Sequence, residues 1–143
     1  MFIGEFSHNL DDKNRLMIPI KFRTSLSDGL VITRGLDGCL WLYPKAEFES
    51  LAVEISKLPI TQVNSRNFSR LMLSGAMDLE MDKIGRVVIP GYLKDYSAIT
   101  DRVVMAGVYN RIEIWPAEKW QTFKGEMESN SSEIAENLAD IGF

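Results

Sequence analysis

Two short turns of this sequence carry side chains that could recognise a charged partner. Segments 11–15 and 82–86 both place an Asp four residues before an Arg, and an Ile-Pro pair follows each of them. Arg donates two parallel hydrogen bonds to O6 and N7 of guanine, and Lys attracts phosphate. The spacing therefore favours loops that contact a nucleic acid. In the simpler alternative, each Asp and Arg form an ion pair that only braces a turn.

The other reactive residues give little support to catalysis or metal binding. His8 is the only histidine and Cys39 the only cysteine, which is too few for a usual zinc site. Neither residue has a recognisable spacing to a nucleophile or a base, and no glycine-rich phosphate loop occurs. We therefore expect no enzyme activity, no cofactor and no metal. His8 is expected to be structural or merely on the surface, and Cys39 to be a small buried hydrophobic residue.

The two turns belong to a longer internal repeat, which is the strongest signal in the chain. The halves align at an offset of 71 residues around the turns and of 72 residues beyond them. Further matches pair Gly4 with Gly75, Leu10 with Met81, Arg23 with Lys94, Leu42-Tyr43-Pro44 with Ile114-Trp115-Pro116, and Phe48 with Trp120. Each half is too small for a strong core of its own. We predict one pseudo-symmetric domain whose halves share a core.

Composition and charge place few limits on the partner. No apolar run approaches the roughly 20 residues of a membrane span, the N-terminus does not resemble a secretory signal, and a lone cysteine fits a reducing cytoplasm. The net charge is −4, but residues 125–143 contain five acids and no Lys or Arg, so the remaining body carries +1. The overall charge therefore does not exclude a local basic face, and the tail is expected to be solvated.

Apolar spacing predicts the same order of elements in both halves. The first half should contain an irregular strand or strand pair over 1–10, strands over 16–18, 30–33 and 39–42, and helices over 21–26 and from Pro44 onward. The second should contain strands over 78–82, 86–89, 102–106 and 111–115, and helices over 90–96 and from Pro116 onward. We divide the chain into a first repeat (1–60), a connecting helix (61–74), a second repeat (75–125) and an acidic tail (126–143) that either frays or forms a last helix.

The repeated residues resemble the MraZ family. The first half matches at Gly4, Asp11-x-Lys13-x-Arg15, Ile18-Pro19 and Arg23, and the second at Leu71, Gly75, Asp82-x-x-Gly85-Arg86, Ile89-Pro90, Gly107 and Glu113-Ile114-Trp115. The resemblance covers residues 1 to about 125, and the two Asp-x-x-x-Arg motifs are the family's hallmark.

This resemblance implies an α+β fold with a mainly β core, namely a swapped-hairpin β-barrel of the AbrB type built from two repeats with flanking helices. It implies a bacterial transcription regulator, typically a repressor, of the division and cell-wall gene cluster that includes its own gene. Such a regulator binds short direct repeats in double-stranded promoter DNA and assembles as a ring of many subunits. It would be cytoplasmic and nucleoid-associated, without membrane attachment.

The resemblance also suggests roles for the turn residues. Those expected to contact DNA are Lys13, Asn14, Arg15, Lys83 and Arg86, and those expected to hold the loops are Asp11, Asp82 and Gly85. The second turn departs from the first, because Lys83 directly follows the Asp and Ile84 stands where the first turn has Lys13.

A second hypothesis is a protein-interaction module, such as the antidote half of a toxin–antidote pair. The AbrB-type barrel is also used there, and the acidic tail could cover a basic partner. Only some fifteen residues lie beyond the repeat, which is short for that role. Salt-dependent DNA binding would discriminate between the two hypotheses.

Overall fold

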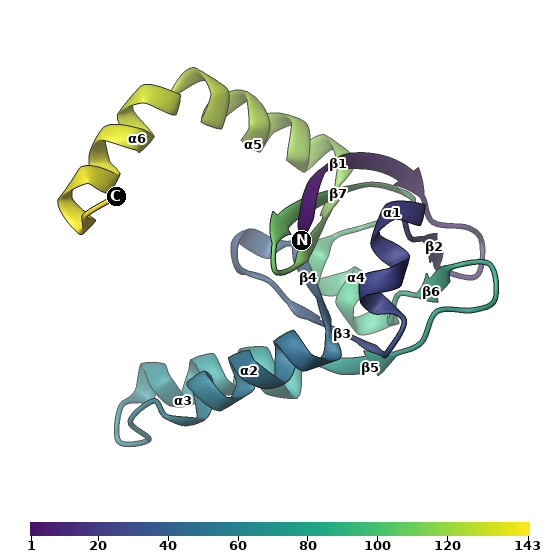
Figure 1. Ribbon diagram of the computed structural model, residues 1–143, viewed down its shortest axis with the longest axis horizontal. Coiled ribbons are helices and arrows are strands. Elements are labelled where there is room, and N and C mark those ends of the chain that lie inside the picture. The colour runs from purple at the N-terminus through teal and green to yellow at the C-terminus, as the bar shows by residue number, and fades with distance from the viewer.

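The computed structural model describes all 143 residues and shows a mainly antiparallel α+β fold (Figure 1). A six-stranded sheet has the order β1-β7-β8-β4-β3-β5, and β2 pairs with β6 in a separate ribbon. The strands are β1 (Phe2–Asn9), β2 (Arg15–Met17), β3 (Leu30–Arg34), β4 (Leu40–Pro44), β5 (Met77–Leu79), β6 (Arg86–Val88), β7 (Arg102–Tyr109) and β8 (Ile112–Pro116).

The expected closed barrel is not seen. The strands at the two ends of the large sheet, β1 and β5, do not pair with each other. β5 is only three residues long and pairs with β3 on one edge alone. The sheet is open, while the predicted α+β class with a mainly β core is confirmed.

Helices follow the strands in the same order in both halves. They are α1 (Ile20–Arg23), α2 (Lys45–Ser56), α3 (Val63–Ser69), α4 (Gly91–Ser97), α5 (Ala117–Ser129) and α6 (Ser131–Leu138), with short turns η1 (Thr24–Leu26), η2 (Leu36–Gly38), η3 (Arg70–Ser74) and η4 (Ala139–Ile141). Pro44 and Pro116 close their strands and cap the next helices. The helix starts predicted at these prolines are confirmed.

The sequence repeat appears in space as a pseudo-twofold arrangement of strands. The strands of the first half, β1 to β4, correspond in order to β5 to β8 of the second half. When each strand is exchanged for its counterpart, the order of the six-stranded sheet is the same as before but reversed, as a twofold axis requires. Leu16 pairs with Val87, and Trp41 pairs with Glu113. Both pairs join repeat-equivalent positions, so the pseudo-twofold axis passes through the ribbon and through the centre of the sheet.

One hydrophobic core serves both halves, as the repeat predicts. Its 18 buried residues come from both repeats and include Leu16 and Val87 from the ribbon. Cys39, which was expected to be structural, is buried as well, and so are Tyr43 and Trp115 at matched positions of the repeat. Because each half supplies only part of this apolar surface, the ribbon is anchored to the whole domain.

One element differs from its sequence-based expectation. Residues 2–9 form a single strand, β1, which pairs with β7 along its entire length, where an irregular strand or strand pair was expected. Of the two alternatives for the acidic tail, the structure shows the helical one: α5 continues past residue 126 and α6 follows it. The strands expected around Asp37 and Gly38 are confirmed, and both of these turn residues have a positive φ.

Two helical arms leave the body on one side. α2 with α3 and α5 with α6 extend to the left of Figure 1, whereas β2, β6 and the turns before them lie at the right edge. None of the helices combines the length and apolar character that a membrane span requires. The arms and the turns therefore offer two separate surfaces.

Candidate nucleic-acid interface

The β2–β6 ribbon presents both motif arginines on one face. Strand residues alternate between faces, and Leu16 and Val87 point into the core with 0% and 1% exposure. Their neighbours Arg15 and Arg86 consequently lie on the outer face, at diagonal positions of the antiparallel pair. The ribbon places two cations from distant parts of the sequence side by side on the surface.

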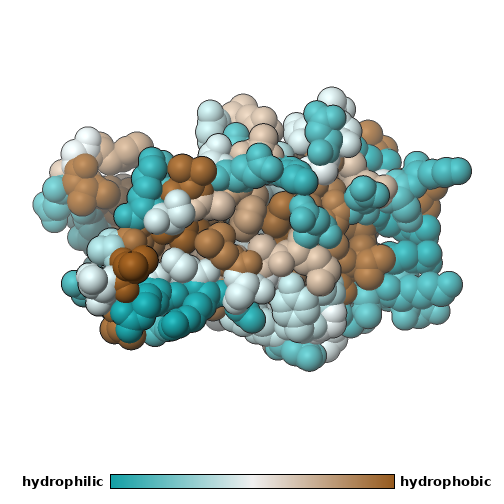
Figure 2. All heavy atoms as spheres, turned by 90° about the horizontal axis from the view of Figure 1, so that it is seen from below, coloured by the Kyte–Doolittle hydropathy of each residue, from teal (hydrophilic) through white to brown (hydrophobic).

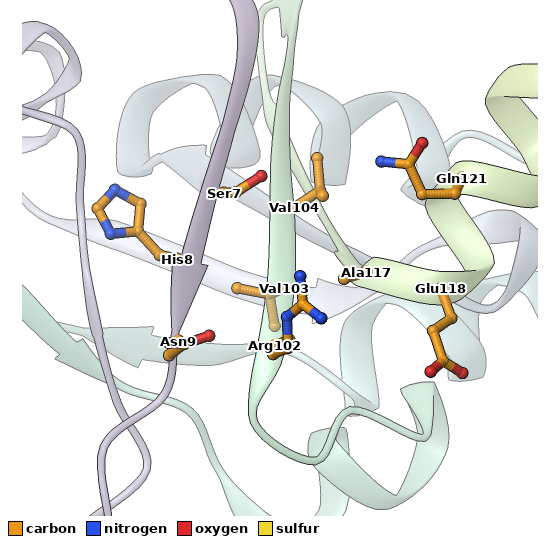
Figure 3. A pocket seen from close by; sticks show the side chains of 9 residues that line it. All are labelled: Ser7, His8, Asn9, Arg102, Val103, Val104, Ala117, Glu118 and Gln121. Carbon is orange, nitrogen blue, oxygen red and sulfur yellow. The ribbon is translucent and has the colours of Figure 1, made fainter.

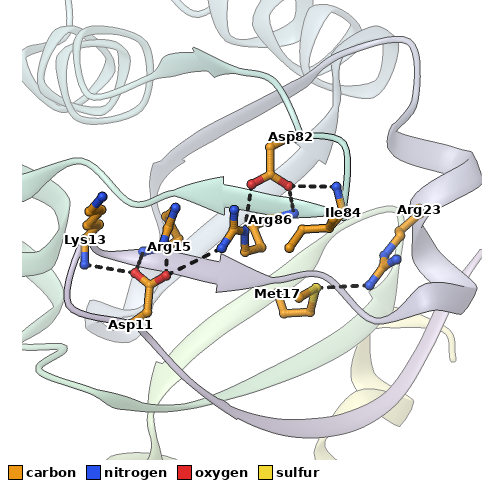
Figure 4. Close-up of polar contacts among 8 residues, drawn as sticks. All are labelled: Asp11, Lys13, Arg15, Met17, Arg23, Asp82, Ile84 and Arg86. Carbon is orange, nitrogen blue, oxygen red and sulfur yellow. Dashed lines mark hydrogen bonds and ion pairs between the residues drawn. The ribbon is translucent and has the colours of Figure 1, made fainter.

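The carboxylate of Asp11 organises the first turn (Figure 4). Its Oδ1 accepts hydrogen bonds from the backbone N–H groups of Lys13 and Arg15, both at 2.9 Å. Its Oδ2 accepts from Arg15 Nε at 2.6 Å. A single side chain thus fixes both the backbone of the turn and the direction of the guanidinium group.

Asp82 repeats this arrangement in the second turn (Figure 4). Its Oδ1 accepts from the N–H groups of Ile84 at 3.1 Å and Arg86 at 2.8 Å, and its Oδ2 accepts from Arg86 Nε at 2.7 Å. The ion pairs considered from the sequence therefore exist in both turns. Ile84 occupies the position of Lys13, so the second turn lacks that cation and carries Lys83 one residue earlier.

Hydrogen bonding keeps both aspartates ionised. The backbone N–H of Arg15 is the largest cause that lowers the pKa of Asp11, and the backbone N–H of Arg86 does the same for Asp82. Desolvation is the second-largest effect and opposes this shift, and the hydrogen bonds from the arginine side chains then lower both pKa values further. The carboxylates accordingly remain acceptors at neutral pH.

Each turn is also attached to the opposite repeat. The N–H of Ile89 donates to the carbonyl of Asn14, and the N–H of Ile18 donates to that of Gly85, both at 2.9 Å. Asn14 and Gly85 are repeat-equivalent and have φ values of +59° and +91°. Asn and Gly are the residues that best tolerate this left-handed conformation. The exchange makes the positions of the two turns interdependent.

Two cations at matched positions of the repeat, for which the sequence suggested no role, contact the turns. Lys94 Nζ donates to Asn14 Oδ1 at 2.6 Å. Its counterpart Arg23 donates from Nε to the carbonyl of Ile18 at 2.9 Å and packs against Gly85, where an added Cβ would overlap that Nε. The matching of Arg23 with Lys94 in the repeat was the signal for this role.

The surroundings of the turns are basic although the chain is acidic. Segments 11–23 and 82–94 together contain seven Lys and Arg residues and three Asp residues, a net charge of +4, in a protein of net charge −4. Lys13 and Lys83 are exposed. Arg86 Nη1 also lies 4.0 Å from Asp11 Oδ2, an ion pair that joins the two turns (Figure 4). The arginine side chains retain 28% and 26% exposure, so their Nη groups can still reach a partner.

The surface hollow around His8 does not assemble a comparable site. It is lined by residues of β1, β7 and α5, and Ser7 and His8 project to opposite sides of β1 (Figure 3). No group of three His, Cys, Asp or Glu residues is placed to hold a metal ion. Burial raises the pKa of the Cys39 thiol to about 12, which suppresses the thiolate form.

Comparison with known proteins agrees with the duplicated geometry. The family model described as "MraZ protein, putative antitoxin-like" matches residues 1–71 and again residues 72–141. The chain belongs to the MraZ family. The second match includes most of the acidic tail, beyond residue 125, where the resemblance seen in the sequence ended.

Full-length relatives carry one name. "Transcriptional regulator MraZ" of Natranaerobius thermophilus is 48% identical over 141 residues, which is 99% of both chains. The protein of that name from Lactobacillus johnsonii is also 48% identical over 141 residues, and that from Clostridium acetobutylicum is 45% identical over 142 residues, each with 99% of both chains covered.

Proposed function

We propose that this chain is a sequence-specific, DNA-binding regulator of transcription that reads double-stranded DNA with the β2–β6 ribbon and its two turns. The observation that carries the proposal is the pair of arginines, each fixed by its own Asp, on one outer face. The names of the full-length relatives support a role in transcription. We propose no catalytic role and no cofactor.

The bracing ion pairs favour recognition by preorganisation. Because Nε of each arginine is bound to an Asp, the guanidinium is oriented before DNA arrives and less side-chain entropy is lost on binding. The Nη groups of Arg15 and Arg86 would donate to base edges in the major groove, which admits a two-stranded ribbon. Lys13 and Lys83 would contact phosphates, and the Asn14 side chain would contribute beside them. Asp11, Asp82 and Gly85 would hold the loops.

The finer parts of the proposal follow the family resemblance. The chain would repress the bacterial division and cell-wall gene cluster that includes its own gene, by binding short direct repeats in the promoter as a ring of many subunits. This activity would take place at the nucleoid in the cytoplasm. The exchange of strands between the repeats supports a swapped-hairpin relationship of the AbrB type.

Repetition would offset the small number of cations in each copy. The chain has a pI near 5.0, so few basic groups are available for phosphate contacts. When several copies are linked, the second and later contacts form at a high effective concentration. A ring could therefore bind tandem sites usefully although each ribbon binds weakly.

The test is binding to DNA from upstream of the chain's own gene, compared with scrambled DNA, at two salt concentrations. Arg15→Ala and Arg86→Ala should each reduce the preference for the promoter. Lys13→Ala should weaken binding to both DNAs and lower the salt slope by about 1. Lys45→Ala is the matched control, because it removes an exposed cation at the start of α2.

Specific, salt-sensitive binding that depends on the two arginines would support the proposal. Equal and weak binding of the wild-type chain to both DNAs would overturn it. In that case the Asp–Arg turns are structural braces, and a partner protein becomes the better hypothesis.

A further inference from the structure

A hollow beside α1 combines an apolar lining with basic side chains. It lies where β1, the end of β2 and the start of α1 meet, and these three elements lie together in Figure 1. We call it the α1 hollow, and its volume is about 510 Å³. Small-molecule sites have volumes in this range, and they are concave and mostly apolar with a few polar groups. The α1 hollow has the size and the shape of a ligand site.

The apolar lining is held in place by the core. Phe6 packs edge-on against the buried Phe22, with 5.2 Å between the ring centroids. Ile18, which also lines the hollow, is 0% exposed, whereas Ile20 is 78% exposed and offers its side chain freely. A ligand would meet a preformed surface, so binding would cost little side-chain entropy.

The polar lining is basic. His8, Lys21 and Arg23 line the hollow, and no Asp or Glu does so. Lys21 Nζ lies 5.3 Å from the centroid of the Phe6 ring, which places the ammonium group over the apolar lining. Arg23 Nη2 contacts Met17 Sδ at 3.1 Å, which places the guanidinium group beside the same lining (Figure 4). In a protein of net charge −4, this hollow favours an anion.

Exposed apolar side chains alone do not identify a ligand site. On the face that Figure 2 shows, apolar residues in brown are interspersed with hydrophilic residues in teal. Such scattered exposure is normal on protein surfaces and needs no explanation. The α1 hollow differs because its apolar side chains surround a concave space and have basic groups next to them.

The second half of the chain lacks this combination. At the offset of 71 residues, Ile20 corresponds to Gly91 and Lys21 corresponds to Tyr92. The hydroxyl of Tyr92 donates to the carbonyl of Gly75 at 2.9 Å and so serves the structure. The second turn and its half of the ribbon form without an aliphatic and a cationic side chain at these positions. The duplicated fold therefore does not require the α1 hollow.

We propose that the α1 hollow binds a small amphiphile that has a linear aliphatic chain and a carboxylate head group. The aliphatic chain would lie on the apolar lining, and its burial would supply most of the binding energy. The carboxylate would accept charge-assisted hydrogen bonds from Lys21 and Arg23. This site is separate from the contacts that the two turns would make with DNA, so the proposal does not rest on the proposed function.

The experiment is isothermal titration calorimetry of the full-length chain without DNA, with octanoate, hexanoate and 1-octanol as probes. Octanoate should bind saturably, with one molecule per chain. Its affinity should exceed that of hexanoate by up to about fourfold for each added methylene, the value for full burial. It should also exceed that of 1-octanol, which has the same chain length and no charge.

Two variants separate the contributions of the chain and the head group. Ile20→Ser removes part of the apolar lining and should weaken the binding of octanoate and 1-octanol alike. Lys21→Glu should weaken the binding of octanoate by more than about fivefold, because it replaces the attraction of an exposed ion pair by a repulsion. The affinity of Lys21→Glu for 1-octanol should stay close to that of the wild type.

Each variant has a matched control outside the α1 hollow. Ile60→Ser removes an isoleucine that is 77% exposed, close to the 78% of Ile20. Lys119→Glu reverses a lysine whose Nζ lies 5.8 Å from the centroid of the Trp115 ring, a pair similar to that of Lys21 with its aromatic ring. Both controls should bind octanoate as the wild type does. Circular dichroism with a thermal melt checks that all four variants are folded.

Three results for octanoate would each overturn the proposal: no saturable binding to the wild type, an affinity no higher than that of 1-octanol, or an unchanged preference over 1-octanol in Lys21→Glu. A loss in Lys119→Glu as large as that in Lys21→Glu would overturn it as well. Because DNA is absent and both motif arginines are intact in every variant, failure of DNA recognition leaves this result unaffected.

Discussion

Replacement of Asp11 by Asn separates the two roles that a carboxylate could have in a DNA-binding turn. The amide is nearly isosteric, and its oxygen can still accept the N–H groups of Lys13 and Arg15 at the position of Oδ1. Its NH₂ group then faces Arg15 Nε, a donor, at a position where the wild type has a 2.6 Å bond. The turn keeps its backbone bonds, but Arg15 loses the acceptor that orients it.

The expected result is a loss of specificity with a gain in non-specific attraction. A good bidentate contact of Arg with guanine is worth about 5- to 150-fold in discrimination. Asp11→Asn should reduce the ratio of promoter to scrambled affinity by a factor within that range. The variant also gains one unit of positive charge, so binding to scrambled DNA should strengthen and depend more steeply on salt.

Asp12→Asn is the control for this charge effect. Asp12 is the next residue, is exposed, and accepts no hydrogen bond in the turn. It produces the same change in net charge, and it should strengthen binding to both DNAs equally without changing their ratio. Fluorescence anisotropy with both DNAs at about 50 and 200 mM salt measures these quantities. If Asp11→Asn and Asp12→Asn behave alike, the idea that the brace preorganises the arginine is refuted.

Three further predictions concern how the ribbon is held. Both motif aspartates have lowered pKa values in the folded chain. Their contribution to the free energy of unfolding should therefore be complete above the ordinary Asp pKa of about 4, and it should be lost as the pH falls through their lower folded values. NMR of the backbone amides of Arg15 and Arg86 should follow this loss. Leu16→Ala should lower the free energy of unfolding in urea by about 2–5 kcal/mol, whereas Val88→Ala, on the outer face, should change it by less than about 1 kcal/mol. Gly85→Ala should destabilise the fold, because φ is +91° and the new Cβ would displace Arg23; a thermal melt measures this.

The two turns could be predicted from the sequence because their signals are local and occur twice. The Asp-x-x-x-Arg spacing and the following Ile-Pro pair mark the turn wherever it lies in the fold. The left-handed conformation of Asn14 and Gly85 appears only in the structure. The shared core also followed from the repeat, since each half is too small to bury its own apolar residues.

The pairing between halves could not be predicted in this way. Register depends on contacts between segments far apart in the chain, such as Phe2 with Tyr109, and local propensity contains no information about them. The open sheet has the same origin: β5 forms only three residues of strand, and a family resemblance gives no strand length. The contact of Lys94 with Asn14 likewise requires the folded pseudo-twofold arrangement.

The side chains of the two turns differ in a way that bears on the type of DNA site. Their backbones are equivalent, but Lys13 in one corresponds to Ile84 in the other, so a single ribbon presents an asymmetric surface. An isologous dimer of such ribbons would read an inverted repeat, because its symmetry reverses the second copy. The proposed ring repeats every copy in the same sense, because the contacts that close a ring are heterologous. Successive asymmetric ribbons would then face the DNA in one direction, which is the arrangement that direct repeats require.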